Sequence, residues 1–186
     1  MTTPDAVATI SHAAAAEYRG WRGMLAGTGL PGPDIHPIPL PAEAQPTSAE
    51  ALASVRSRYA VGHLPLVLVV GSHEPRKNHL AVLHAAELLW RQGKEFSLLF
   101  VGGNSWKSER FSQRLHELRA QGRPIEATLK LTEDVLWATY RIAHVVLFPS
   151  LNEGFGLPVA EALACGVPAI TSNFGSMAEI AEDGGA

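Results

Sequence analysis

The feature that most constrains the fold is a regular alternation of short apolar runs and amphipathic helical patterns. The apolar runs, which we predict to be strands, are residues 66–70, 96–101, 125–129, 145–148 and 168–171. The helical patterns that follow them are residues 79–91, 109–120, 132–142, 158–164 and 176–182. Apolar strands separated by helices are typical of a parallel sheet that is covered on both faces. The sequence therefore predicts an α/β fold with a doubly wound parallel sheet.

The first sixty residues follow a different pattern. A short strand is predicted at residues 7–10 and a helix at residues 12–25, with Ser11 as its N-cap. Residues 27–46 contain six prolines, which breaks regular structure but allows an extended segment at residues 35–40. A helix at residues 49–59 follows. We expect residues 1–43 to be the tail of another domain with a linker, residues 44–186 to be the α/β domain, and the sequence to be truncated at both ends.

Charge and apolar content exclude two classes of function. Fifteen Lys and Arg residues against 18 Asp and Glu residues give a net charge of −3, which argues against a polybasic nucleic-acid binder. No apolar run approaches the roughly 20 residues of a membrane span, and no basic segment precedes residues 6–10 as in a signal peptide. We expect a cytoplasmic protein without a nucleic-acid partner.

Metal and disulfide chemistry are not expected either. Cys165 is the only cysteine, so it cannot form an internal disulfide or a cysteine-rich zinc site. His73, His79 and His84 lack the i, i+4 spacing of a helical zinc pair. We expect these residues to be structural, although His73 is close enough in sequence to the basic residues described next to contact a bound phosphate.

Two loops at the carboxyl ends of predicted strands are candidate ligand sites, and the first of them has the composition of an anion site. In a doubly wound sheet, ligands bind at these ends. Gly71 is followed by Arg76 and Lys77 at the start of a helix, where free N–H groups also attract anions. The alternative is a solvated basic turn. Gly102 and Gly103 follow the next strand and permit close approach of a ligand, or provide only a turn that needs positive φ.

The loop at residues 149–158 carries the most chemistry. Gly154 and Gly156 expose backbone N–H groups, and Pro158 suits the first turn of the following helix. Glu153 and Glu161 flank that helix start and are predicted to face one crevice, on the order of 10 Å apart by the helical rise. That separation suits two parts of one ligand. The alternative is that both acids only complement the helix dipole.

These motifs resemble a known family. Residues 148–170, which read FPSLNEGFGLPVAEALACGVPAI, are similar to the signature of family 4 retaining glycosyltransferases of the GT-B fold. Residues 74–78 and 103–106 resemble its bacterial mannosyltransferase-like branch. The resemblance runs from about Val67 to Gly185, and residues 7–25 are similar to the end of the acceptor-side domain of such enzymes.

The resemblance implies a role for each site residue. Arg76 and Lys77 would neutralise the diphosphate of a nucleotide sugar, Glu153 would contact the sugar hydroxyls, and Glu161 would accept hydrogen bonds from the ribose. The backbone from Gly154 to Leu157 would cradle phosphate and sugar. The residues that the resemblance implies are, as catalytic, Glu153, Lys77 and Arg76, and, as donor-binding, Gly71, Arg76, Lys77, Gly103, Gly154, Phe155, Gly156, Leu157 and Glu161.

The resemblance also implies the reaction. A hexose, with mannose favoured, would pass with retention from GDP-mannose or a UDP-hexose to a glycan or lipid-linked acceptor, without a metal or other cofactor. This chain would supply the donor-binding half, and its partner would be the missing acceptor-side domain, with the full enzyme at the inner face of the membrane.

Two other functions stay open. A cleft with one wall loses the orientation of two substrates, so the isolated chain is expected to be an inactive, nucleotide-binding fragment. A GT-B epimerase acting on UDP-sugars is the third hypothesis, and the spacing of Glu153 and Glu161 argues against it.

Overall fold

A computed structural model describes residues 4–30, 32–60 and 63–183. Its main feature is a five-stranded sheet in the order β5-β4-β3-β6-β7, in which every neighbouring pair is parallel. The strands are β3 (Leu66–Val70), β4 (Ser97–Val101), β5 (Ile125–Thr128), β6 (Val145–Phe148) and β7 (Ala169–Thr171). The predicted α/β class and doubly wound parallel sheet are confirmed.

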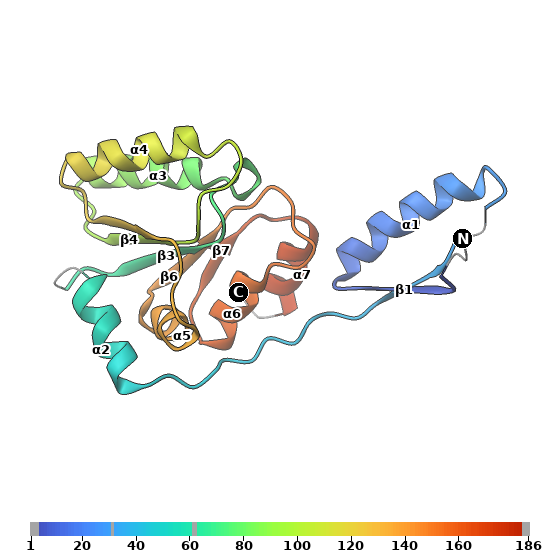
Figure 1. The fold of residues 1–186 in the computed structure, drawn as a ribbon, viewed down its shortest axis with the longest axis horizontal. Coiled ribbons are helices and arrows are strands. Elements are labelled where there is room, and N and C mark those ends of the chain that lie inside the picture. Colours follow the sequence, from blue (N-terminus) through green and yellow to red (C-terminus); the bar gives the residue numbers. More distant parts are fainter. Residues whose placement is uncertain (1–3, 31, 61–62, 184–186) are drawn as a thin grey trace.

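Helices cover both faces of this sheet (Figure 1). On one face, α3 (His79–Arg91) packs beside α4 (Glu109–Ala120). The other helices pack as the pairs α2 (Ala49–Arg58) with α5 (Glu133–Ile142), and α6 (Leu157–Ala164) with α7 (Gly175–Asp183). Within the described residues, no helix is long and apolar enough to cross a membrane.

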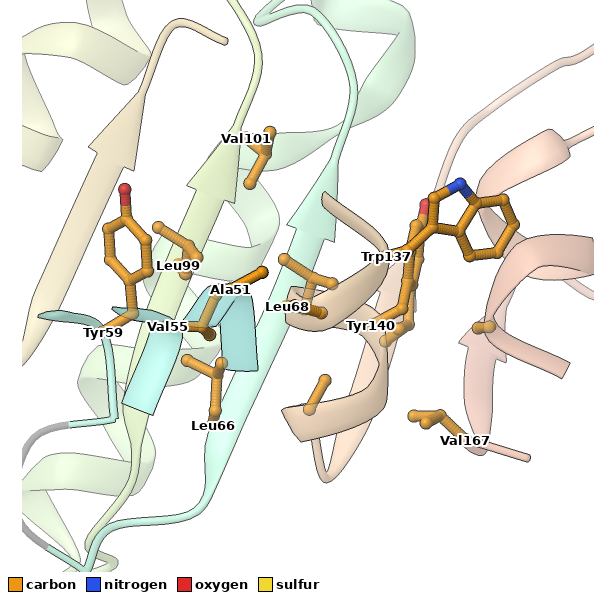
Figure 2. Close-up of a cluster of buried hydrophobic side chains, with 14 residues drawn as sticks. Ala51, Val55, Tyr59, Leu66, Leu68, Leu99, Val101, Trp137, Tyr140 and Val167 are labelled. Atoms are coloured by element: carbon orange, nitrogen blue, oxygen red, sulfur yellow. The ribbon is translucent and has the colours of Figure 1, made fainter. Parts of the chain in front are cut away.

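The alternation of side chains along each strand divides the core in two. Leu68 and Leu99 belong to the cluster formed with α2 and α5, which Figure 2 shows around Val55 and Tyr140. Val69 and Phe100, the next residue along each strand, belong to the cluster formed with α3 and α4. All four side chains are fully buried, so both faces of β3 and β4 require apolar residues. This explains why these strands appear in the sequence as uninterrupted apolar runs.

The N-terminal residues form a separate β-α-β unit beside α7 (Figure 1). It consists of β1 (Ala6–Thr9), α1 (His12–Ala26) and β2 (Asp34–Pro37). The two strands pair in parallel, with Val7 opposite Ile35. The extended segment expected at residues 35–40 is thus partly a strand, because its first residues complete a ladder with β1. After β2 the chain runs without helix or strand to Ser48, the N-cap of α2.

Candidate functional site

The site lies where the strand order of the sheet reverses. Beginning at central β3, the chain first builds β4 and β5 on one side and then returns to place β6 on the other side. The loops that follow β3 and β6 are therefore neighbours at the carboxyl edge, which is the usual ligand position in such sheets. A backbone hydrogen bond joins them, from the Leu151 N–H to the Arg76 carbonyl at 2.8 Å.

The first loop, residues 71–78, is called here the cation loop. Gly71 begins it at a φ of 144°, a conformation that favours glycine. Pro75–Lys77 then form one 3-10 turn, and Asn78, at a φ of 57°, separates this turn from α3. The two cations therefore lie on a turn of their own, whereas the sequence predicted them at the start of the helix. The Lys77 side chain runs along Gly71 and places its Nζ 4.8 Å from the Phe148 ring centroid.

Two cations and two carboxylates form an ionic cluster between the loops. Lys77 Nζ donates to Glu153 Oε1 at 2.6 Å, and Arg76 Nη1 lies 2.8 Å from Glu153 Oε2. Arg76 Nη2 donates to Glu74 Oε1 at 2.7 Å. The buried Ser150 hydroxyl donates to Glu153 Oε1 at 2.6 Å. The side chains of Lys77 and Glu153 are only 13% and 11% exposed, so this pair is largely removed from water.

The contacts in the ionic cluster favour the charged forms of Glu153 and Arg76. Burial raises the pKa of Glu153, but hydrogen bonds from Lys77, Ser150 and Arg76 outweigh burial and hold this pKa below its ordinary value. The hydrogen bond to Glu153 is the main cause that raises the pKa of Arg76. The anion that the sequence required beside two adjacent cations is thus already supplied by the chain itself. Sequence reasoning missed this pairing, because Glu153 lies 76 residues beyond Lys77.

The second loop, residues 152–157, is called here the glycine elbow. Gly156 has a φ of 116° and is the N-cap of α6, which begins at Leu157 with a proline in its first turn. Hydrogen bonds fix the backbone on several sides: the Ser176 hydroxyl donates to the Glu153 carbonyl at 2.9 Å, and the Ser11 hydroxyl donates to the Gly154 carbonyl at 2.7 Å. Phe155 is buried. The elbow is therefore a fixed turn that presents the start of α6 beside the ionic cluster.

Glu161 occupies a different environment from Glu153. The Tyr140 hydroxyl donates to Glu161 Oε2 at 2.5 Å, and burial, followed by the charge of Glu161, raises the pKa of Tyr140. Glu161 also lines a cavity of about 290 Å³ together with Trp137 and Leu157. The structure thus joins Glu153 to Arg76 and Lys77, and it places Glu161 against α5. Among the described residues, no hydrogen bond links the two carboxylates directly.

The loop after β4 packs against the cation loop. At Gly102, which has a φ of 155°, an added Cβ would lie 2.0 Å from the Gly71 carbonyl oxygen. At Gly103 an added Cβ would lie 2.7 Å from Leu129 Cδ1. The indole N–H of Trp106 donates to Glu74 Oε2 at 3.1 Å. The close approach that the two glycines permit is therefore an approach of the protein's own chain.

Two buried histidines form a contact that the sequence did not reveal. The Nδ1 atoms of His73 and His79 are 3.1 Å apart, among the rings of Phe100 and Phe111. Burial lowers the pKa of His79 to about 3, with further lowering from the charges of His73 and Lys77. His73 is only 5% exposed, which leaves it little access to a bound phosphate. Within the part of the chain that the structure describes, no group of three or more His, Cys, Asp or Glu residues could hold a metal ion.

The fold and the site define a Rossmann-like domain with paired charges at its switch point. The sequence profile described as "Glycosyl transferases group 1" matches residues 56–186. The chain belongs to the group 1 glycosyltransferase family.

Curated relatives agree with this family, and solved structures share the fold. The chain is 31% identical over 144 residues to "Serotype-specific mannosyltransferase WbdA" of Escherichia coli, covering 77% of this chain and 17% of the relative. It is 31% identical over 141 residues to "O-antigen chain mannosyltransferase B" of Escherichia coli, covering 75% and 37%. Among solved GT-B structures, Anabaena HepE in complex with UDP and glucose has a TM-score of 0.74 at 17% identity, covering 94% of this chain and 46% of that one. The chain thus spans less than half the length of each of these proteins.

Proposed function

We propose that this chain supplies the donor-binding half of a retaining, metal-independent glycosyltransferase that takes a hexose from a nucleoside-diphosphate sugar. GDP-mannose is our first candidate and a UDP-hexose our second. The observation that carries the proposal is the position of Arg76 and Lys77, which lie at the switch point beside the glycine elbow. The names of the two Escherichia coli relatives support mannose, and the UDP and glucose in the HepE title support a nucleotide-sugar donor.

The charge distribution suits the departure of a diphosphate. When the bond from the sugar to the diphosphate breaks, negative charge develops on the leaving group, and fixed cations stabilise that charge. Lys77 and Arg76 supply two positive charges, and the N-terminus of α6 adds free N–H groups from the glycine elbow. In this proposal the backbone of Gly71 and of Gly103 borders the same pocket.

The two glutamates take different parts of the donor. Glu153 accepts hydrogen bonds from the sugar hydroxyls, and Glu161, from its cavity beside Trp137, accepts hydrogen bonds from the ribose. The backbone of Gly154, Phe155, Gly156 and Leu157 cradles phosphate and sugar. The acceptor oxygen then attacks the sugar on the face that the diphosphate leaves, and the departing phosphate oxygen takes the acceptor proton. This path accounts for retention without a covalent intermediate.

The remainder of the enzyme lies outside this unit. We propose that residues 1–43 belong to the acceptor-side domain and its linker, that residues 44–186 bind the donor, and that the acceptor is a glycan or a lipid-linked molecule at the inner membrane face. For the isolated chain we propose binding without turnover, because the acceptor requires a second wall of the cleft. An assay of sugar transfer from a radiolabelled nucleotide sugar distinguishes binding alone from turnover. Any product formed by this chain alone would contradict the proposal that it binds without turnover.

The decisive test is nucleotide affinity in a lysine variant. We expect Lys77→Ala to weaken calorimetric binding of GDP or UDP by roughly 1.5–3 kcal/mol, the contribution of a hydrogen bond to a charged group. The matched control is Lys94→Ala. Lys94 is an exposed lysine before β4, at the opposite edge of the sheet. Equal affinities of the Lys77 variant and the unsubstituted chain would refute the phosphate assignment.

A further inference from the structure

We propose that Glu153 makes the site discriminate between a nucleoside diphosphate that carries a sugar and one that does not. In the free protein its carboxylate binds both cations of the site and competes with a bare diphosphate for them. A donor that carries its sugar gives the displaced carboxylate new hydrogen bonds from the sugar hydroxyls. A bare nucleoside diphosphate does not. This inference rests on the proposed function and adds to it a specificity-determining role for one residue.

The first observation is that both cations are already occupied. Each oxygen of the Glu153 carboxylate faces a different cation, Oε1 the Lys77 ammonium at 2.6 Å and Oε2 the Arg76 guanidinium at 2.8 Å. The ammonium keeps further protons, so a phosphate oxygen can still approach it. That oxygen would then lie roughly 4–5 Å from the carboxylate, given ordinary hydrogen-bond lengths at one nitrogen. Two like charges at that separation repel strongly in a site of low exposure.

The second observation concerns the hydrogen-bond donors that remain to the Glu153 carboxylate after a phosphate displaces it from the two cations. The Glu153 side chain is 11% exposed, so water replaces lost partners poorly. Apart from the two cations, the side-chain donor on it is the Ser150 hydroxyl, at 2.6 Å. A buried carboxylate that loses its cations needs new hydrogen-bond donors, or its displacement becomes costly.

A sugar on the diphosphate supplies those donors. Its hydroxyl groups are carried next to the terminal phosphate, so they arrive at the carboxylate together with the charge that displaces it. At the position of the sugar a bare nucleoside diphosphate has no hydroxyl groups, and its terminal phosphate oxygens add negative charge there. Glu153 therefore returns to Lys77 and Arg76 once the sugar has left, and this return favours release of the product.

Glu74 provides the contrast within the same cluster. It also pairs with Arg76, at 2.7 Å, but its carboxylate accepts further hydrogen bonds from the Ser72 hydroxyl and the Trp106 indole. Glu74 therefore keeps partners whether or not Arg76 binds a phosphate. Removal of its charge tests the general electrostatic effect of one fewer carboxylate near the site.

The test measures dissociation constants by calorimetry and takes the ratio between a bare nucleotide and its sugar form. The two pairs are GDP with GDP-mannose, and UDP with UDP-glucose. The proteins are the unsubstituted chain, Glu153→Gln and Glu74→Gln. We expect Glu153→Gln to bind the bare diphosphate about tenfold more tightly than the unsubstituted chain does. The preference of this variant for the sugar form over the bare diphosphate should fall by about the same factor. For Glu74→Gln we expect the ratio to change by less than about twofold, since both ligands gain equally.

Three results would overturn the inference. The first is that Glu153→Gln binds the bare diphosphate with unchanged or weaker affinity. The second is that Glu74→Gln changes the ratio of the two dissociation constants as much as Glu153→Gln does. The third is that none of the three proteins binds any nucleotide; this result would overturn the proposed function as well, so it is distinguishable from the first two. Glutamine keeps the volume of the side chain, and melting followed by circular dichroism checks the fold. Glu153→Ala gives an independent measurement, for which we expect the same tightening toward bare diphosphate.

Discussion

Substitution of one glycine tests whether the cation loop depends on its contact with the loop after β4. In Gly102→Ala the new Cβ would lie 2.0 Å from the Gly71 carbonyl oxygen and 2.5 Å from its carbonyl carbon. Both are backbone atoms, so no side chain can turn aside to relieve the contact. The backbone of Gly71, which begins the cation loop, must shift or the strand ends must separate.

Two terms contribute to the expected loss of stability. An alanine at positive φ costs about 1–2 kcal/mol, and enforced overpacking adds about 1–3 kcal/mol. We therefore expect Gly102→Ala to lower the free energy of unfolding by roughly 2–5 kcal/mol, a large part of the 5–15 kcal/mol of a typical domain. At about 2–4 °C per kcal/mol for a chain of this size, the melting temperature should fall by roughly 10 °C.

The matched control is Gly93→Ala. Gly93 has a φ of 78°, but nothing lies within 4 Å of its added Cβ, so this variant carries the backbone term alone. Urea unfolding and thermal melting of both variants isolate the contact with Gly71, and nucleotide calorimetry shows whether the shift reaches the cation loop. If Gly102→Ala destabilises the protein no more than Gly93→Ala does, the tight contact between the two loops is refuted.

Two further predictions concern α2 and the histidine pair. Ser48→Ala should lower the free energy of unfolding by about 1–2 kcal/mol, because the Ser48 hydroxyl accepts from the Ala51 N–H at 3.1 Å and donates to Asp134 at 2.6 Å; unaltered urea unfolding would contradict this. His79 has a pKa of about 3 in the folded chain against 6.5 in the unfolded chain, so only the unfolded state takes up this proton as the pH falls from 6.5 toward 3. Stability should decline over that window by up to about 1.4 kcal/mol per pH unit, and the slope should flatten in His79→Leu; an equal slope in that variant would argue against the buried neutral ring.

Much of the fold was predictable from the sequence because local signals and tertiary packing agree. The strands 66–70 and 145–148 and the helices 79–91 and 109–120 have the predicted bounds. The strand predicted at residues 96–101 begins one residue later, at Ser97. Phe96 instead stacks on Trp90, with the ring centroids 5.0 Å apart. Apolar character identifies a buried residue, but it does not show whether the backbone has joined the ladder.

The candidate site was predictable in its location and less so in its contacts. The switch-point rule brings the loops after β3 and β6 together, so the proximity of Lys77 and the glycine elbow follows from topology. No local pattern reveals that Glu153 pairs with both cations, since this depends on side-chain direction across two loops. The contact between His73 and His79 was missed because their six-residue separation fits no helix period, and the intervening 3-10 turn had not been predicted. The roles of these residues with a donor remain predictions.

The attachment of the N-terminal β-α-β unit has a mechanical consequence. Both carboxylate oxygens of Glu179 accept the N–H groups of His12 and Ala13 at 3.0 Å, and the Ser11 hydroxyl holds the carbonyl of Gly154. A displacement of this unit would therefore be transmitted to Gly154, the residue next to Glu153, by the Ser11 hydrogen bond. A second route runs through α7, which carries both Glu179 and Ser176, because the Ser176 hydroxyl donates to the Glu153 carbonyl.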